Sequence, residues 1–173
     1  MSVTRKTWTE DSVDDSLLEV PFDQGLSRLS AAERDALLEA AEHKTFRRGE
    51  AILSEGRRND SIYVVAEGTV RIERTVGVVA QYGTVGARPG PRHRTVQIAH
   101  LGRGSIFGEM SFLEDAGASA NVIANEGVGA FRISLDVIEQ FCQWDPSFAG
   151  RLYQSLAMTL ANRLRATNRR LAD

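Results

Sequence analysis

The regular pattern of apolar positions begins at residue 30, where it predicts a helix. Ser30-Ala31-Ala32-Glu33 is a capping box, in which the serine and glutamate side chains each satisfy a backbone N–H of the first turn. The next residues are rich in alanine, leucine and glutamate and extend this helix through Ala41. Its apolar face consists of Leu29, Leu37, Leu38 and Ala41. The preceding residues are polar and mixed in charge, so we expect 1–24 to be an N-terminal tail or docking segment.

Between Lys44 and Ser134 the pattern changes to short β-type runs separated by glycine. The runs are 45–46, 51–53, 61–65, 69–72, 95–98, 121–124 and 129–133. Many short strands with regular turn signals indicate an antiparallel sandwich or roll. Residues 76–94 contain four glycines and two prolines, and we expect them to form a long irregular hairpin tip.

After Ser134 the pattern returns to helix. Ser134 predicts a cap for a helix over the next residues, and Asp145-Pro146 predicts a second start, with the proline at the first helical position. From there one helix is predicted to run to about Leu171. Steps of four and three connect Tyr153, Ala157, Leu160, Leu164, Thr167 and Leu171. This is the spacing of a coiled-coil seam. Two interpretations stay open: the seam packs on the roll, or it joins two copies in a homodimer.

The fold class that these patterns predict is mainly β, an antiparallel β-roll or jelly roll. It would span residues 25–173, with an N-terminal helix and a long C-terminal helix that acts as a hinge or dimer element. The net charge of −2 and pI near 6.0 provide no global field toward nucleic acid, which is not an expected partner. No apolar run approaches the ~20 residues of a membrane span, and residues 1–20 have no signal-peptide core. We therefore expect a cytoplasmic protein without a membrane partner.

The residue types that carry enzyme chemistry are sparse. Cys142 is the single cysteine, so an intramolecular disulfide and a thiolate zinc site are excluded, and we expect it to be a small core residue. His43, His93 and His100 lack the close spacing of the metal ligands in a cupin-type enzyme, which has a similar roll architecture. No nucleophile–base arrangement is evident. The sequence therefore predicts a protein that is not an enzyme, with no prosthetic group and no metal.

The most specific motif is Leu101–Leu113, which reads Leu-Gly-Arg-Gly-Ser-Ile-Phe-Gly-Glu-Met-Ser-Phe-Leu, followed by Ser119–Ala124. It resembles the phosphate-binding cassette of the cyclic-nucleotide-binding domain family, found in the catabolite activator protein, protein kinase A regulatory subunits and gated channels. Further landmarks in the same order are Arg48-Gly49-Glu50, Gly56, the hairpin 62–70, and the helix from Asp145-Pro146 through Arg163-Leu164. The resemblance covers roughly residues 25–172.

The resemblance implies a pocket for cAMP or cGMP. In the cassette, a short helical turn presents free backbone N–H groups to the cyclic phosphate, as helix N-termini do for anions. Glu109 is implied to accept hydrogen bonds from the ribose 2′-hydroxyl, while Met110, Phe112 and Leu113 would anchor the turn in the core. The implied ligand-binding residues are Gly108, Glu109, Met110, Ser111, Ser119, Ala120 and Asn121, with Thr167 and Asn168 near the purine base. Two alternatives stay open. In one, Glu109 caps the cassette turn; in the other, Thr167 and Asn168 are solvent-facing residues.

One position departs from the family pattern. Members that bind cyclic nucleotides usually carry Pro-Arg-Ser/Thr-Ala late in the cassette, where the arginine pairs with the phosphate. Here the stretch reads Gly117-Ala118-Ser119-Ala120, with Ala118 at the arginine position. Losing one partner of a buried charged pair costs ~2–5 kcal/mol. Because each 1.4 kcal/mol is a tenfold change in affinity, this cost corresponds to a loss of affinity of roughly thirty-fold to several thousand-fold. A replacement cation from Arg88, Arg92, His93 or Arg94, a different ligand, or an empty pocket would each account for it.

The function that the resemblance implies is a regulatory sensor. In the family, the ligand draws the cassette and the terminal helix together. The size of this conformational shift is limited by the difference between the ligand's affinities for the two conformations. No DNA-reading helix-turn-helix follows the last helix, so we expect the output to pass through a separate effector protein or a rearranged homodimer. The alternative is a degenerate, nucleotide-free protein-interaction module or an accessory subunit of a larger assembly.

Overall fold

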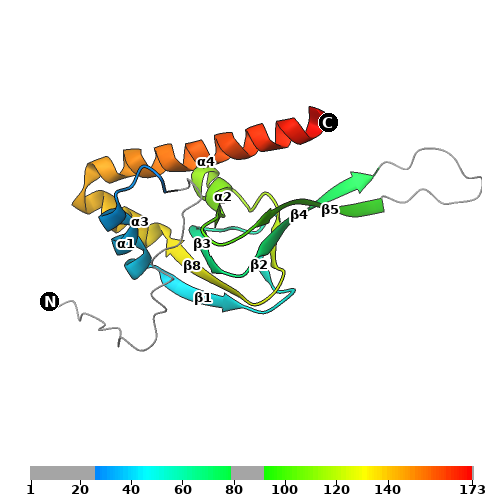
Figure 1. Ribbon diagram of the computed structural model, residues 1–173, viewed down its shortest axis with the longest axis horizontal. Coiled ribbons are helices and arrows are strands. Elements are labelled where there is room, and N and C mark those ends of the chain that lie inside the picture. The colour runs from blue at the N-terminus through cyan, green and yellow to red at the C-terminus, as the bar shows by residue number, and fades with distance from the viewer. Residues whose placement is uncertain (1–25, 79–91, 173) are drawn as a thin grey trace, which may run out of the picture.

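The computed structural model describes residues 26–78 and 92–172, which form two four-stranded antiparallel sheets with flanking helices (Figure 1). The elements are α1 (Ala31–Ala40), β1 (Glu42–Phe46), β2 (Ala51–Leu53), β3 (Ser61–Glu67), β4 (Val70–Val78), β5 (Arg92–Leu101), β6 (Ile106–Phe107), α2 (Glu109–Glu114), β7 (Asn121–Ala124), β8 (Val128–Ser134), α3 (Leu135–Trp144) and α4 (Pro146–Ala172). The strand orders are β1-β8-β3-β6 and β2-β7-β4-β5. The predicted jelly roll with an N-terminal helix and a long C-terminal helix is confirmed.

Strand β3 connects two hydrophobic clusters because both of its faces are buried. Its side chains alternate in direction, as they do along any strand. Ile62 and Val64 join the cluster between the first sheet and helices α1, α3 and α4. Tyr63 and Val65 join the second cluster, which fills the space between the two sheets. Val64 and Val65 have no exposed surface, and burying each stabilises the fold by about 1.5–3 kcal/mol.

The predicted helix starts are confirmed at the level of individual hydrogen bonds. Ser30 Oγ accepts from the backbone N–H of Glu33 at 3.2 Å, and Glu33 Oε2 accepts from that of Ser30 at 2.7 Å. The Ser134 hydroxyl accepts from the N–H of Val137 and caps α3. At the start of α4, Asp145 Oδ1 accepts from the N–H of Ser147 at 2.9 Å. Local side-chain caps thus define where these helices begin.

An ion-pair network connects α1 with the first turn of α4. Arg151 donates to Glu33 and, at 2.7 Å, to Asp145 Oδ2. The hydrogen bonds from Ser147, assisted by Arg151, lower the pKa of Asp145 to about 2. The backbone N–H of Ser30, followed by Arg151, lowers the pKa of Glu33. The network therefore depends on both carboxylates being ionised.

The pattern-based boundaries were wrong at the hairpin between β4 and β5. The irregular tip expected over 76–94 is shorter, because β4 continues to Val78 and pairs with β5 from Arg92 onward. Figure 1 shows this two-stranded ribbon extending away from the body of the domain. The ladder of backbone hydrogen bonds overrides the weak strand preference of Gly77. Residues 79–91, like the expected tail 1–24, lie outside the described residues.

Cys142 is partly buried and packs against the first cluster, as expected for a small core residue.

Within residues 26–78 and 92–172, no helix combines the length and the apolar character that a membrane crossing requires.

Candidate ligand-binding pocket

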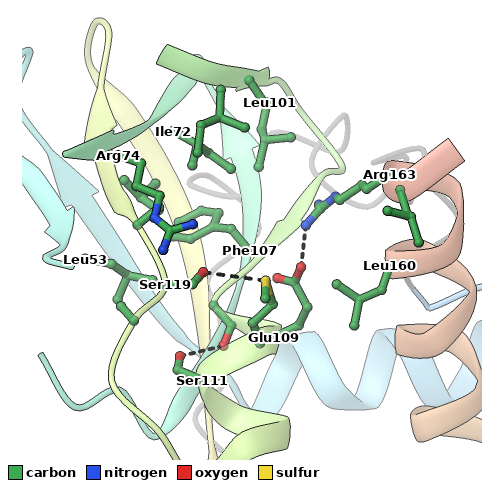
Figure 2. A pocket seen from close by; sticks show the side chains of 18 of the residues that line it. Leu53, Ile72, Arg74, Leu101, Phe107, Glu109, Ser111, Ser119, Leu160 and Arg163 are labelled. Atoms are coloured by element: carbon green, nitrogen blue, oxygen red, sulfur yellow. Dashed lines mark hydrogen bonds and ion pairs between the residues drawn. The ribbon is translucent and has the colours of Figure 1, made fainter. Parts of the chain in front are cut away.

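A pocket of about 560 Å³ lies between the cassette, the second sheet and α4 (Figure 2). Apolar side chains from five strands and α4 make up most of its lining: Leu53, Ile72, Ile98, Ala99, Leu101, Phe107, Val122, Leu160, Leu164 and Ala166. Three charged side chains, those of Arg74, Glu109 and Arg163, also line it. A mostly apolar cavity of this size with a few polar groups is typical of a small-molecule site.

Gly108 sets the sharp turn that leads from β6 into α2. Its φ of 83° lies in the left-handed region, and a Cβ there would lie 2.9 Å from the Ser61 carbonyl oxygen and from Asn59 Nδ2. Only glycine fits this close approach without a shift of the backbone. Asn59 Nδ2 also donates to Ser111 Oγ at 3.0 Å, and Ser111 Oγ donates to the Gly108 carbonyl at 3.1 Å. Ser111 lines the pocket, yet its buried hydroxyl holds the cassette turn against the start of β3.

Glu109 is a buried carboxylate at the junction of the cassette and α4. It is 3% exposed, and Arg163 Nη1 donates to its Oε1 at 2.5 Å. The other terminal nitrogen of Arg163 donates to the backbone carbonyl of Ile106. Figure 2 shows Arg163 reaching from α4 to Glu109 across one side of the pocket. The carboxylate therefore connects the cassette to the last helix.

Sequence reasoning missed the role of Arg163, although a signal was present. From the sequence, Arg163 was named only as part of the C-terminal helix landmark Arg163-Leu164, and no contact was assigned to it. Its position, however, is three residues after Leu160 and one before Leu164, so all three share a helix face. All three line the pocket. The seam predicted along α4 thus faces the cassette over this stretch, and Tyr153 extends it by stacking on Phe112 with ring centroids 6.5 Å apart.

The predicted ligand-binding residues divide into two groups. Gly108, Glu109, Met110, Ser111, Ser119 and Ala120 all line the pocket. Ser119 Oγ donates to Met110 Sδ at 3.5 Å. Asn121 lies outside the lining, and its Oδ1 accepts from the backbone N–H of Glu55 at 2.8 Å. Asn168 is exposed and is not among the lining residues, and the side chain of Thr167 lies outside the description.

The expected anchoring of the cassette turn was wrong for two of its three residues. Phe112 packs against the first cluster, as predicted. Met110 and Leu113 are each 38% exposed, because α2 is a short helix with only one side against the core. Met110 instead forms part of the pocket wall.

The stretch that departs from the family pattern is held tightly by its backbone. The N–H of Ala118 donates to the Arg57 carbonyl at 2.8 Å, and Gly117 forms an isolated bridge with Arg58. A Cβ on Gly117 would lie 2.5 Å from the Gly56 carbonyl oxygen, so this position also requires glycine. Ala118 is 5% exposed and lines the pocket, which places its Cβ where a longer side chain would enter the cavity.

Arg74 of β4 is a pocket cation that the sequence did not suggest. Its side chain is 60% exposed and lies 3.5 Å from Glu55, measured from Nε to Oε1. The cations proposed from the sequence lie elsewhere: His93 and Arg94 are on the β4–β5 ribbon and do not line the pocket. Arg88 and the side chain of Arg92 lie outside the described residues.

Metal ligands do not gather in the part of the chain that the structure describes: no three His, Cys, Asp or Glu residues there are placed to hold an ion. His100, one of the histidines considered for a cupin site, instead contacts the amide side chains of Gln97 and Asn125 at 2.6 and 3.1 Å.

Comparison with known proteins places this geometry in a family. The profile of the cyclic nucleotide-binding domain matches residues 43–145. Glutaminase 1 of Bradyrhizobium diazoefficiens is 30% identical over 152 residues, which are 88% of this chain and 21% of that protein. The cAMP-dependent protein kinase regulatory subunit of Mycosarcoma maydis is 31% identical over 108 residues, 62% of this chain and 17% of that subunit. The chain thus spans about a fifth of the length of these two relatives.

Among solved structures, that of the Thermus thermophilus catabolite activator protein is similar, with 28% identity and a TM-score of 0.64. The match covers 86% of this chain and 62% of that one. The family profile covers more than half of the chain and includes the cassette and the turn at Gly108. The chain belongs to the cyclic nucleotide-binding domain family.

Proposed function

We propose that the protein is a non-catalytic regulatory sensor that binds a cyclic nucleotide, cAMP or cGMP, in the pocket beside Glu109. The observation that carries this proposal is the buried Glu109 carboxylate at the wall of a largely apolar cavity of about 560 Å³. A carboxylate accepts hydrogen bonds from hydroxyl groups, and apolar walls suit a purine ring. The similarity to a cAMP-dependent kinase regulatory subunit supports the same ligand class.

The contact between Glu109 and Arg163 suggests how binding would be transmitted. Arg163 already donates to Oε1 of Glu109, so a ligand hydroxyl at this carboxylate must share it or displace the arginine. Either result changes how α4 is held against the cassette. A ligand shifts such an equilibrium only by its difference in affinity for the two states. Ligand binding would therefore be transmitted through α4.

The receiver of the signal would be a separate effector protein or a second copy of the chain, in the cytoplasm. Tyr153 and Leu164 on α4 contact the cassette or the pocket, yet they remain 47% and 62% exposed. Large apolar side chains exposed along one helix suit a protein contact, so α4 is the surface that we propose for a homodimer. Sedimentation velocity of the wild type against Leu164→Glu tests this: the variant should sediment as a monomer where the wild type is a dimer. A wild type that is monomeric at all concentrations would contradict it.

Titration calorimetry with cAMP, cGMP and a cyclic dinucleotide, up to millimolar ligand, tests the proposed function. We expect micromolar binding of cAMP or cGMP. Glu109→Gln keeps the size of the side chain and removes its charge, and it should weaken binding at least tenfold. Glu114→Gln is the matched control, since this residue is on the same helix but exposed and outside the lining. Circular dichroism would verify that both variants fold, and equal affinity of both would remove Glu109 from the site.

A second candidate, a nucleotide-free interaction module or accessory subunit, is favoured by two observations. Ala118 occupies the place where the family resemblance implies an arginine, and the Arg163 guanidinium already satisfies Glu109. In that case no cyclic nucleotide would bind up to millimolar concentration. Ala118→Arg separates the two candidates further, since it should raise affinity in a pocket that still has the shape for a nucleotide.

A further inference from the structure

The charges that line the pocket are not balanced. Glu109 and Arg163 form an ion pair, so their charges compensate each other. The third charged lining residue, Arg74, has its nearest carboxylate partner in Glu55, which is outside the lining. Arg74 is therefore the lining cation whose carboxylate partner lies outside the pocket, and a ligand with a single negative charge would complement it there.

The strand register places Arg74 beside the part of the cassette that departs from the family pattern. Strands β4 and β7 are paired up to Glu73 and Asn121. Arg74 is the next residue on β4, and Ala120 is the residue before Asn121 on the other side. Because side chains alternate along a strand, Arg74 shares the pocket face with Ile72, and both line the cavity. Figure 2 shows Arg74 on the same side of the pocket as Ser119, with Glu109 and Arg163 on the other.

The present partner of Arg74 leaves its guanidinium available to a stronger ligand. The pair with Glu55 is 3.5 Å long and the arginine is 60% exposed, and such exposed pairs contribute little. Glu55 has a second interaction, since its Oε2 accepts from the backbone N–H of Thr75 at 3.1 Å. A guanidinium forms two parallel hydrogen bonds to a phosphate, which a single long contact to a carboxylate does not match.

We infer that Arg74 of β4 binds the anionic group of the ligand, in place of an arginine from the cassette, and that this group is a singly charged phosphodiester. The inference rests on the proposed function, because it assigns the anion partner within the same pocket. The cation that binds the phosphate would then come from the second sheet and not from the cassette. The cassette would still supply the carboxylate proposed to bind the ribose.

The test is calorimetric titration of the full chain with cAMP and cGMP, for the wild type and five variants. Arg74→Gln should weaken binding at least tenfold, and Arg74→Lys should retain part of the affinity. Arg103→Gln is the charge-matched control, because this arginine is exposed and outside the lining, and it should bind like the wild type. In an Ala118→Arg background, Arg74→Gln should change the affinity less than threefold, because both arginines would serve one phosphate.

The outcomes separate the inference from the proposed function. Wild-type binding that Arg74→Gln leaves unchanged would overturn the role of Arg74 and leave the sensor intact. Equal effects of Arg74→Gln with and without the second arginine would also overturn it, because the side chain would then act elsewhere. Binding only after Ala118→Arg would show that Arg74 does not supply the charge. No binding by the wild type or by Ala118→Arg would refute the sensor function, and the inference with it.

Discussion

Replacing Arg163 by methionine tests whether α4 is held to the cassette by the ion pair with Glu109. The substitution keeps a long apolar stem on the pocket face of the helix and removes the guanidinium. Glu109 then loses the donor at 2.5 Å to its Oε1, and the Ile106 carbonyl loses its bond from the same side chain. The side chain of Glu109 is only 4% exposed, so little water is available as a replacement.

The expected cost follows from the burial of the two partners. Removing one partner of a fully buried ion pair costs about 3–5 kcal/mol, because the other charge remains without compensation. The Arg163 side chain is 28% exposed, so the pair is only partly buried and we expect a smaller cost of about 2–3 kcal/mol. For a chain of this size each kcal/mol changes Tm by about 2–4 °C, and we expect a decrease of roughly 5–10 °C.

Urea unfolding followed by circular dichroism measures this free energy, with Arg165→Met as the control. Arg165 is exposed on α4 and donates to Asn162 on the same helix, so its replacement should stay within about 0.5 kcal/mol of the wild type. A double-mutant cycle with Glu109→Gln should give a coupling energy of about 1 kcal/mol or more.

Two results would refute this reasoning. One is an Arg163→Met variant as stable as the Arg165→Met control. The other is additive effects of Glu109→Gln and Arg163→Met, because the two side chains would then contribute independently. In either case the helix would be held by the packing of its apolar residues, and the proposed transmission through Glu109 would lose its basis.

Three further predictions concern the cassette turn and the start of α4. Gly108→Ala should lower the free energy of unfolding by about 2 kcal/mol or more, since it adds a Cβ at a φ of 83° and 2.9 Å from a backbone oxygen, whereas Gly127→Ala, with nothing within 4 Å, should be neutral in the same urea titration. Ser111→Ala removes a buried hydroxyl with two hydrogen bonds and should cost about 1–2 kcal/mol by the same measurement. The pKa of Asp145 is about 2 in the folded chain and ~3.9 in an unfolded one, so its ionised form stabilises the fold above pH ~4 and this contribution is lost as the pH falls through about 2. Asp145→Asn should therefore show a smaller decrease of Tm between pH 5 and pH 2 than the wild type, and parallel curves would contradict the assignment.

Local signals in the sequence were sufficient for most of the fold. The capping box at Ser30, the cap at Ser134 and the start at Asp145-Pro146 each involve residues within about four positions of one another, and the structure has all three helices there. A short, mostly apolar run of β-type residues likewise predicted 61–65 as a strand, which lies in β3. Such features depend on short-range geometry, which the order of residues fixes directly.

Long-range pairing decided what the pattern could not. β6 has only two residues, too few for a periodicity, and exists because Phe107 pairs with Tyr63, far away in the chain. The β4–β5 ribbon extends to Val78 because each strand supplies the partner for the other. Backbone hydrogen bonds between distant segments thus set these boundaries, against the local preference of the residues.

The pocket residues show the same difference between what the sequence indicated and what the tertiary structure added. The sequence alone indicated the cassette, with Gly108 and Glu109, and the substitution at Ala118. Only the tertiary structure brought in Arg74 from β4 and Arg163 from α4, which lie 35 residues before and 54 residues after Glu109. A charge has its effect through distances in space, and no spacing along the chain encodes which distant arginine faces a given carboxylate.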